Sequence, residues 1–282
     1  MRIALIANEA SGGGLDPGPL ADTMRRHGAE VSACGCDPED LEAVPGWEPD
    51  RIAVAGGDGT IGDAAQLAGR LGVPLALIPM GTANDFARSA ELPLEADAAC
   101  ALAVTGEELR PRELGRLADG RPFVNAASAG LGTVAARQAQ PFKRLGPLAY
   151  PLGALRAAAT ERPLRCTVRA DGREVFADDA WQAIVAVTGA FGGGSEIGAA
   201  DPDDGVLDAA VLPAGSRLGL ARRAWGLRRG TIAEQEDVLH ARGHVVEVDL
   251  PPGTQLNVDG ELRDGGMERV TVERAAFQLV VG

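Results

Sequence analysis

Residues 51–60 read RIAVAGGDGT, and this stretch decides the fold of the first half of the chain. Arg51–Ala55 is a short, mostly apolar run of the kind that forms a buried strand. A turn follows at once, Gly56-Gly57-Asp58-Gly59, and the apolar residues between Thr60 and Leu71 then recur at helical spacing. A strand that runs through a glycine-rich turn into a helix is typical of α/β domains that hold a phosphate group at the helix N-terminus.

The residues on either side repeat this alternation of strand and helix. We expect further strands at Arg2–Ala7, Glu30–Ala33 and Leu75–Ile78, one helix between Pro19 and Gly28, and another over about 95–105. Strands that alternate with helices predict a parallel sheet covered by helices. We therefore expect an α/β nucleotide-binding domain over residues 1–115.

After about residue 107 the pattern changes to the two-residue period of antiparallel strands. The expected strands are separated by Gly, Asp and Pro turns and cover residues 168–170, 174–176, 181–187, 206–212, 244–250, 254–258, 270–273 and 277–281. One helical insertion is expected over about 216–231. These patterns predict a second, β-rich domain over residues 116–282.

The composition limits the possible functions. A net charge of −13 repels phosphate backbones, which disfavours nucleic-acid binding as a function. The four cysteines are too few for a disulfide scaffold and suit reduced thiols in the cytoplasm. Because no 18 apolar residues run together, we expect any membrane contact to be peripheral.

The glycine-rich turn has the chemistry of a phosphate-binding loop. Gly56, Gly57 and Gly59 carry no side chain that would block a polyphosphate, and backbone N–H groups at a helix start attract anions. An aspartate at position 58 would repel phosphate unless a divalent cation lies between them, which favours Mg²⁺. The alternative is that Asp58 only favours the helix N-terminus and that Thr60 and Asp63 form a capping-box-like pair.

A second loop follows the next expected strand directly. Residues 79–88 read PMGTANDFAR, and they must lie at the same sheet edge as residues 56–60, because carboxyl ends of parallel strands meet at one edge. Together, GGDGT and PMGTANDFAR resemble the bacterial diacylglycerol-kinase-like and sphingosine-kinase-like lipid kinases. Four further segments resemble motifs of that family in the same order: FVNAASAGLG at 123–132, LGPLAY at 145–150, DPDDGVLD at 201–208 and DGE at 259–261. GGDGT alone is weaker evidence, since NAD kinases and phosphofructokinases carry versions of it.

The resemblance implies a fold and an activity. The fold would combine an α/β ATP-binding domain of the NAD-kinase and phosphofructokinase type with a β-rich domain for lipid substrate and metal, and the active site would lie in the cleft between them. The activity would be transfer of the γ-phosphoryl group of ATP to a hydroxyl of diacylglycerol or a related lipid, with ATP and Mg²⁺ as cofactors. A soluble-metabolite kinase such as NAD kinase and a non-catalytic nucleotide-binding module stay open as alternatives.

The resemblance also implies roles for individual residues. Glu261 would be the general base. Asp58 and Asp85 would belong to an acidic network that reaches a metal ion through water. Asp204, with the backbone carbonyls of Asp201 and Val206, would hold Mg²⁺. The residues implied to contact ATP are Gly56, Gly57, Asp58, Gly59, Thr60, Ile61, Gly62 and Thr82.

Taken alone, two of these segments have simpler interpretations as turns. Asp259-Gly260 is a leading hairpin signal, and the acids at 203 and 204 suit an Asx-type turn. The chain also departs from the family at Asn8-Glu9, where Asn-Pro is usual, and at Gly62-Asp63, where Asn-Glu is usual. Glu113 stands where the family commonly has Asp.

A basic segment offers a way to reach a lipid surface. Five arginines lie between Ser216 and Gly230 without an acidic residue, interspersed with Leu and Trp: Arg217, Arg222, Arg223, Arg228 and Arg229. Such a helix suits either peripheral contact with the inner membrane face or packing of its apolar side into the protein. His240 and His244 lack the HExxH pattern of a zinc helix, and the sequence around them favours a strand. The oligomeric state is not set by the sequence.

Overall fold

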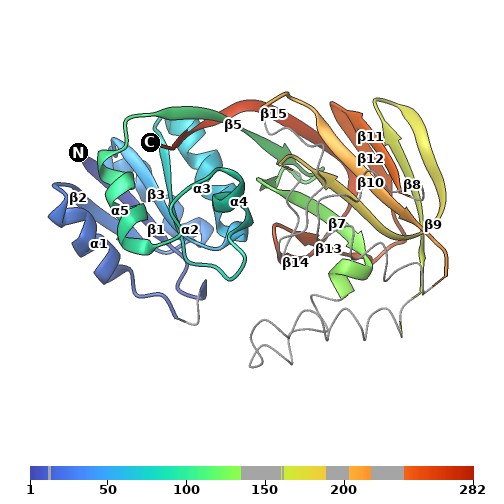
Figure 1. Cartoon of the computed structure of the whole chain (residues 1–282), viewed down its shortest axis with the longest axis horizontal. Helices are drawn as coiled ribbons and strands as arrows, with labels where there is room; N and C mark the ends of the chain where they lie inside the picture. The colour runs from blue at the N-terminus through green and yellow to red at the C-terminus, as the bar shows by residue number, and fades with distance from the viewer. Residues whose placement is uncertain (12–13, 135–159, 161, 189–202, 217–237) are drawn as a thin grey trace. The chain divides into compact units, whose positions relative to one another are not determined.

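The computed structural model describes residues 1–11, 14–134, 160, 162–188, 203–216 and 238–282 (Figure 1). The chain divides into two compact units, unit 1 with Met1–Leu114 and Glu273–Gly282, and unit 2 with Gly115–Val272. Several predictions concern segments outside the described residues: the LGPLAY element, Asp201, and the basic helix with its five arginines.

Unit 1 contains the expected parallel sheet. Strands β1 (Arg2–Ala7), β2 (Glu30–Cys34), β3 (Arg51–Gly56) and β4 (Leu75–Pro79) lie in the order β2-β1-β3-β4, and all pair in parallel. Every residue of β3 and β4 is buried. Nearly continuous burial is what a parallel sheet covered on both faces requires, and it explains why these strands read as apolar runs.

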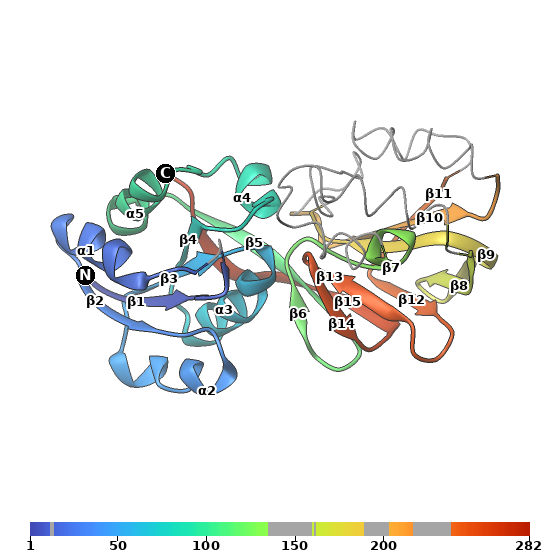
Figure 2. The same ribbon diagram turned by 90° about the horizontal axis from the view of Figure 1, so that it is seen from below.

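Helices cover both faces of this sheet (Figure 2). On one face, α1 (Pro17–Arg26) and α5 (Ala96–Thr105) share a core with alternate residues of β1, among them Ile3 and Leu5. On the other face lies α3 (Asp58–Leu71). Shorter helices are α2 (Pro38–Leu41), the 3₁₀ helix η2 (Val44–Trp47) and α4 (Asp85–Ser89). Of the helices in the described ranges, none is long and apolar enough to cross a bilayer.

The last strand contributes residues to both units, whereas the sequence pattern assigned residues 116–282 to one domain. β15 (Met267–Val280) is one uninterrupted strand, where the sequence predicted two, at 270–273 and 277–281. Its first part pairs antiparallel with β12 (Val245–Asp249) in unit 2. Its last part pairs in parallel with β4 through Leu279 and Leu75 in unit 1. A two-residue period is the same in either sheet, so the sequence pattern could not show the change of partner.

Unit 2 is built from antiparallel strands. They follow the order β14-β13-β7-β9-β8-β12-β15, with β10 beside β9 and β11 beside β10. A buried core is formed by alternate residues of these strands, such as Ala183 with Val185 and Val246 with Val248. The remaining strands are β5 (Leu109–Arg116), which begins in unit 1, β6 (Pro122–Phe123), β7 (Ala126–Gly130), β8 (Leu164–Ala170), β9 (Arg173–Ala186), β10 (Leu207–Pro213), β11 (Leu239–Gly243), β13 (Gln255–Val258) and β14 (Glu261–Asp264).

Strand β9 also joins two predicted strands into one. Residues 174–176 and 181–187 were expected as separate strands, but the structure has a single strand of 14 residues. The polar pair Asp178-Asp179 between them looked like a turn. It stays extended because β8 pairs alongside, and Arg165 of β8 donates to Asp178 at 2.7 Å.

Gly69 tests the packing of α3 against β15 within unit 1. A Cβ atom at this position would lie 2.0 Å from the backbone carbonyl oxygen of Ala276. Alanine normally stabilises a helix interior by about 1 kcal/mol relative to glycine, but overpacking against backbone costs about 1–3 kcal/mol. We therefore expect Gly69→Ala to lower the melting temperature of unit 1 by a few degrees, on the order of 2–4 °C per kcal/mol. Gly46→Ala is the control, because no atom lies within 4 Å of its added Cβ; equal melting of the two variants would contradict this packing.

Candidate functional site

The two glycine-rich loops of unit 1 lie against each other at the ends of β3 and β4. The amide of Met80 donates to the carbonyl of Gly56 at 2.9 Å. A Cβ atom on Gly81 would come within 2.6 Å of the Cα atom of Gly57. The close backbone approach therefore requires glycine at position 81, and it brings the predicted motifs GGDGT and PMGTANDFAR together.

The carboxylate of Asp58 joins these loops by hydrogen bonds. Its oxygens accept the backbone N–H groups of Asp85 at 3.1 Å and of Phe86 at 2.9 Å. These are free amides of the first turn of α4, so Asp58 caps that helix from a distant part of the chain. Sequence reasoning expected Asp58 and Asp85 in one acidic network. The structure brings them together through a backbone amide.

Asn84 shapes the second loop, and the sequence analysis did not single it out. Its backbone is left-handed, with φ of 53°. Its side chain accepts the N–H of Gly81 at 2.8 Å and donates to the carbonyl of the same residue at 3.1 Å. Asparagine tolerates this conformation better than most residues, and the signal for it was the Asn-Asp pair just before the helix.

The end of β1 is tied to the same place through Asn8. Its side-chain amide donates to the hydroxyl of Thr60 at 2.9 Å, and its carbonyl oxygen accepts the N–H of Ala10 at 3.0 Å. A shallow depression is lined by residues of both loops and their neighbours: Gly56, Gly57, Asp58, Ile61, Leu77, Pro79, Asn84 and Ala87. It does not enclose space for a water molecule, so these loops form a surface rather than a closed pocket.

In unit 2 the Asp259-Gly260 turn is also a clamp. Both residues have positive φ, 48° and 87°, as a type I′ hairpin between β13 and β14 requires. The carboxylate of Asp259 accepts the backbone N–H groups of Val124 at 2.7 Å, Asn125 at 2.8 Å and Ala126 at 3.0 Å. The DGE and FVN segments therefore meet through contacts of Asp259 that the sequence analysis, which gave this residue as part of a motif or a turn, did not predict.

Glu261 follows this turn as the first residue of β14. Its carboxylate forms an ion pair with Arg263, two residues further along the same face of the strand. The Glu261 side chain is 40% exposed. The residue that the family resemblance implies as general base is thus accessible and paired with Arg263.

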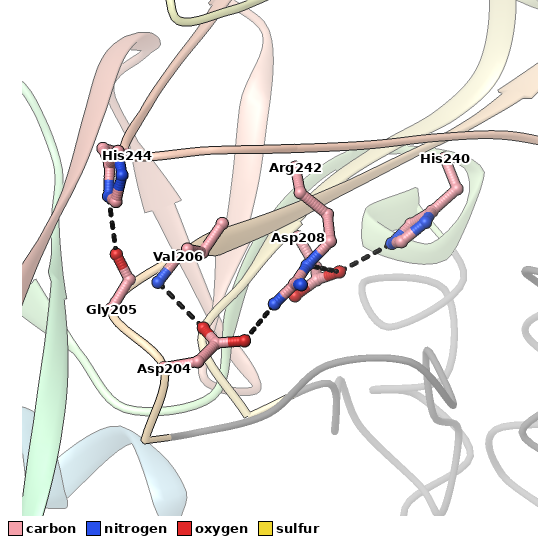
Figure 3. A network of polar contacts seen from close by, with 7 residues as sticks. All are labelled: Asp204, Gly205, Val206, Asp208, His240, Arg242 and His244. Atoms are coloured by element: carbon pink, nitrogen blue, oxygen red, sulfur yellow. Dashed lines mark hydrogen bonds and ion pairs between the residues drawn. The ribbon is translucent and has the colours of Figure 1, made fainter.

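The acidic loop at residues 203–208 lies against three basic side chains (Figure 3). Asp204 accepts the N–H of Val206 at 3.0 Å through one oxygen and pairs with Arg242 through the other. Asp208 is fully buried, and one of its oxygens contacts Nε2 of His240 at 2.6 Å and Nε of Arg242 at 3.3 Å. Nδ1 of His244 lies 2.8 Å from the carbonyl oxygen of Gly205. Because a carbonyl only accepts, this Nδ1 donates.

Arg242 carries a full charge in this position. Its hydrogen bond to Asp204 and the nearby charge of Asp208 raise the pKa of the guanidinium above its ordinary value, against the opposing effect of partial burial. Arg242 lies in strand β11, where the sequence around His240 and His244 favoured a strand. The sequence analysis did not single out Arg242 itself; its place two residues after His240 was the available signal, since residues two apart share one face of a strand.

Comparison with known proteins places both units in one family. A model of the diacylglycerol kinase catalytic domain matches residues 2–117, and a model of the YegS C-terminal NAD kinase beta sandwich-like domain matches residues 125–281. The chain belongs to the diacylglycerol-kinase-like lipid kinase family. The resemblance inferred from the motifs is therefore confirmed.

Individual relatives of this lipid kinase family agree with the assignment. The chain is 33% identical over 239 residues to the "Probable lipid kinase YegS-like" protein of Pseudomonas aeruginosa, covering 81% of this chain and 75% of that protein. It is 28% identical over 293 residues to a diacylglycerol kinase of Mycobacterium tuberculosis, covering 99% and 94%. The fold is similar to that of a diacylglycerol kinase from Bacillus anthracis, with a TM-score of 0.77, 21% identity and coverage of 100% and 97%. An NAD kinase from Archaeoglobus fulgidus in complex with ATP has a TM-score of 0.54, 17% identity and coverage of 99% and 93%, so the predicted NAD-kinase-like fold is confirmed.

The lipid kinase family implies a metal-binding role for the acidic loop, but in the described residues an arginine already pairs with Asp204. Carboxylate and carbonyl oxygens are the ligand types that Mg²⁺ prefers. However, each oxygen of Asp204 already has a partner, in Val206 and Arg242. Across the described ranges, no group of three or more His, Cys, Asp or Glu side chains could hold a metal ion.

The variant Asp58→Asn tests whether Asp58 stabilises unit 1 by capping α4 or acts only on a bound ligand. An amide keeps one acceptor oxygen but turns its NH₂ group toward one of the two backbone donors, which loses a bond and leaves a buried donor unpaired. We expect unit 1 to be destabilised by about 1–2 kcal/mol, measured by urea unfolding without ligand. Asp63→Asn, at an exposed position on the same helix, should change stability little. If Asp58→Asn had the same free energy of unfolding as the wild type, the cap would make no contribution to the stability of unit 1.

Proposed function

We propose that this protein is a lipid kinase that transfers the γ-phosphoryl group of ATP to a hydroxyl of diacylglycerol or a related lipid. Membership of the lipid kinase family supports kinase chemistry. The observation that carries the proposal is the joining of the two glycine loops at Gly57 and Gly81, which leaves a helix N-terminus and backbone amides without side chains in the way of a polyphosphate.

ATP is the proposed phosphoryl donor of unit 1. The amides at the start of α3, a helix of 14 residues, would bind phosphate, and Gly56 to Gly62 with Thr82 would form the contact set. The Asp58 cap would hold the second loop beside the first while the nucleotide enters and leaves. Mg²⁺ bound with ATP would neutralise charge on the phosphates, and we assign no protein ligand to it.

Glu261 is the proposed general base of unit 2. Its carboxylate would take the proton of the lipid hydroxyl as the hydroxyl oxygen attacks the γ-phosphorus, and the bond from the γ-phosphorus to the bridging oxygen of ADP would break. The Asp259 clamp and the hairpin would fix the position of this carboxylate.

The central experiment offers the protein labelled ATP and competing acceptors. Purified protein, γ-³²P-ATP and Mg²⁺ are incubated with a total bacterial lipid extract, and in parallel with NAD. We expect label in the organic phase, with the labelled lipid identified by chromatography. Label in NADP would support the soluble-metabolite alternative. No transfer to either acceptor, together with measurable ATP binding, would support a non-catalytic nucleotide-binding module.

Glu261→Gln tests the general base. The amide keeps the size of the side chain but cannot take a proton, so we expect kcat to fall on the order of 10²-fold or more while ATP binding is retained. Turnover and ATP affinity are measured on the same preparation. Glu268→Gln, at an exposed position of β15, is the matched control. A kcat near that of the wild type would remove Glu261 from the mechanism.

We further propose peripheral contact with the inner membrane face from the cytoplasm, through the basic segment that lies outside the described residues. Each arginine near an anionic membrane gains about 1 kcal/mol. We expect conversion of Arg222, Arg223, Arg228 and Arg229 to Gln to lower activity severalfold on anionic vesicles, with little change on a short-chain lipid in neutral detergent. High salt should have the same effect, because exposed charges are screened. Equal losses on both substrates would indicate that the segment is needed for folding or catalysis itself.

A further inference from the structure

Three basic residues, two in β11 and one just after it, contact the acidic loop of unit 2. β11 pairs antiparallel with β10, so that Arg242 lies opposite Asp208 and His240 opposite Ala210. In Figure 3, His240, Arg242 and His244 all point toward the loop. His240 contacts Asp208, and Arg242 contacts both Asp204 and Asp208. His244 donates to the carbonyl of Gly205.

Arg242 compensates two carboxylates at once. Asp208 has no exposed surface, and one of its oxygens lacks a hydrogen-bond partner among the described residues. A buried carboxylate without a compensating charge is strongly destabilising. The guanidinium reaches Asp208 through Nε and Asp204 through a terminal nitrogen, in the forked geometry that suits arginine to carboxylates.

The same contact restricts the binding of a metal ion. In the described structure Asp204 offers two oxygens, of which one accepts the N–H of Val206 and the other pairs with Arg242. A divalent cation on the second oxygen would lie beside the guanidinium, and the two positive charges would repel each other. Arg242 therefore opposes the binding of a metal ion at this oxygen of Asp204.

We propose that Arg242 is an internal cation that occupies Asp204 and competes with divalent metal ions for it. The loop at residues 203–208 is then complete without a metal, and a divalent ion binds it only after Arg242 has moved away. This inference uses only one element of the proposed function, namely that the protein works in the presence of divalent metal ions such as Mg²⁺.

The test measures metal binding and stability in the absence of ATP and lipid. Melting temperatures of the full-length protein are recorded in EDTA and in millimolar Mg²⁺, and Mn²⁺ binding is followed by electron paramagnetic resonance. We expect the wild type to melt at nearly the same temperature with and without Mg²⁺. Arg242→Gln should melt lower in EDTA, regain part of the loss in Mg²⁺, and bind Mn²⁺ about tenfold more tightly, because removing the charge leaves two uncompensated carboxylates.

Three further variants keep the test decisive. Arg242→Lys retains a positive charge without the fork, so it should fold even if Arg242→Gln does not and should bind Mn²⁺ with intermediate affinity. Arg269→Gln removes an exposed arginine that lies 3.8 Å from Glu247 and should behave as wild type. Asp204→Asn combined with Arg242→Gln or Arg242→Lys should abolish the gain in affinity.

Two results would overturn the proposal: equal Mn²⁺ affinity in the wild type and in the folded Arg242 variants, or a gain that survives Asp204→Asn. Because neither measurement involves phosphoryl transfer, a protein that proved inactive on lipids would leave this inference standing, and an active lipid kinase could still fail it.

Discussion

A carboxylate that accepts backbone amides from a distant segment fixes the candidate site in each unit. In unit 1 Asp58 holds the first turn of α4, and in unit 2 Asp259 holds the three consecutive amides that begin at Val124. Buried amides must find partners when the chain folds. Because these carboxylates supply them, the course of the second glycine loop and of the segment before β7 follows from two side chains. Both aspartates belong to motifs that are usually interpreted through ligand chemistry, and here their described contacts are structural.

The charge balance of the protein is decided locally. The chain carries a net charge of −13, yet the acidic loop of unit 2 is matched by the basic side chains of β11. A family motif specifies residue types and their order. The side chain that pairs with each carboxylate depends on residues elsewhere in the chain. The DPDDGVLD segment shows the consequence: the residues that resemble a metal loop are retained, but an arginine already pairs with one of them.

The elements that could be predicted are those whose signal is local. Strands β1, β3 and β4 and helix α3 agree with the sequence predictions to within two residues, because apolar runs and glycines mark them independently of what lies alongside. Strand β14 was missed, since it is short and rich in polar residues. β9 and β15 were each divided into two, since an exposed polar stretch in a long strand looks the same as a turn until the neighbouring strand is known.

By itself, the sequence determined the family, the parallel and antiparallel halves, and the identity of the chemical groups available to the site. Only the tertiary structure decided what those groups contact: Asp58 with the amides of α4, Asp259 with the amides from Val124 onward, and Asp204 with Arg242. The reason is distance along the chain. These partners lie 27 to 135 residues from their carboxylates, and no local pattern records which donor the fold will bring to an acceptor.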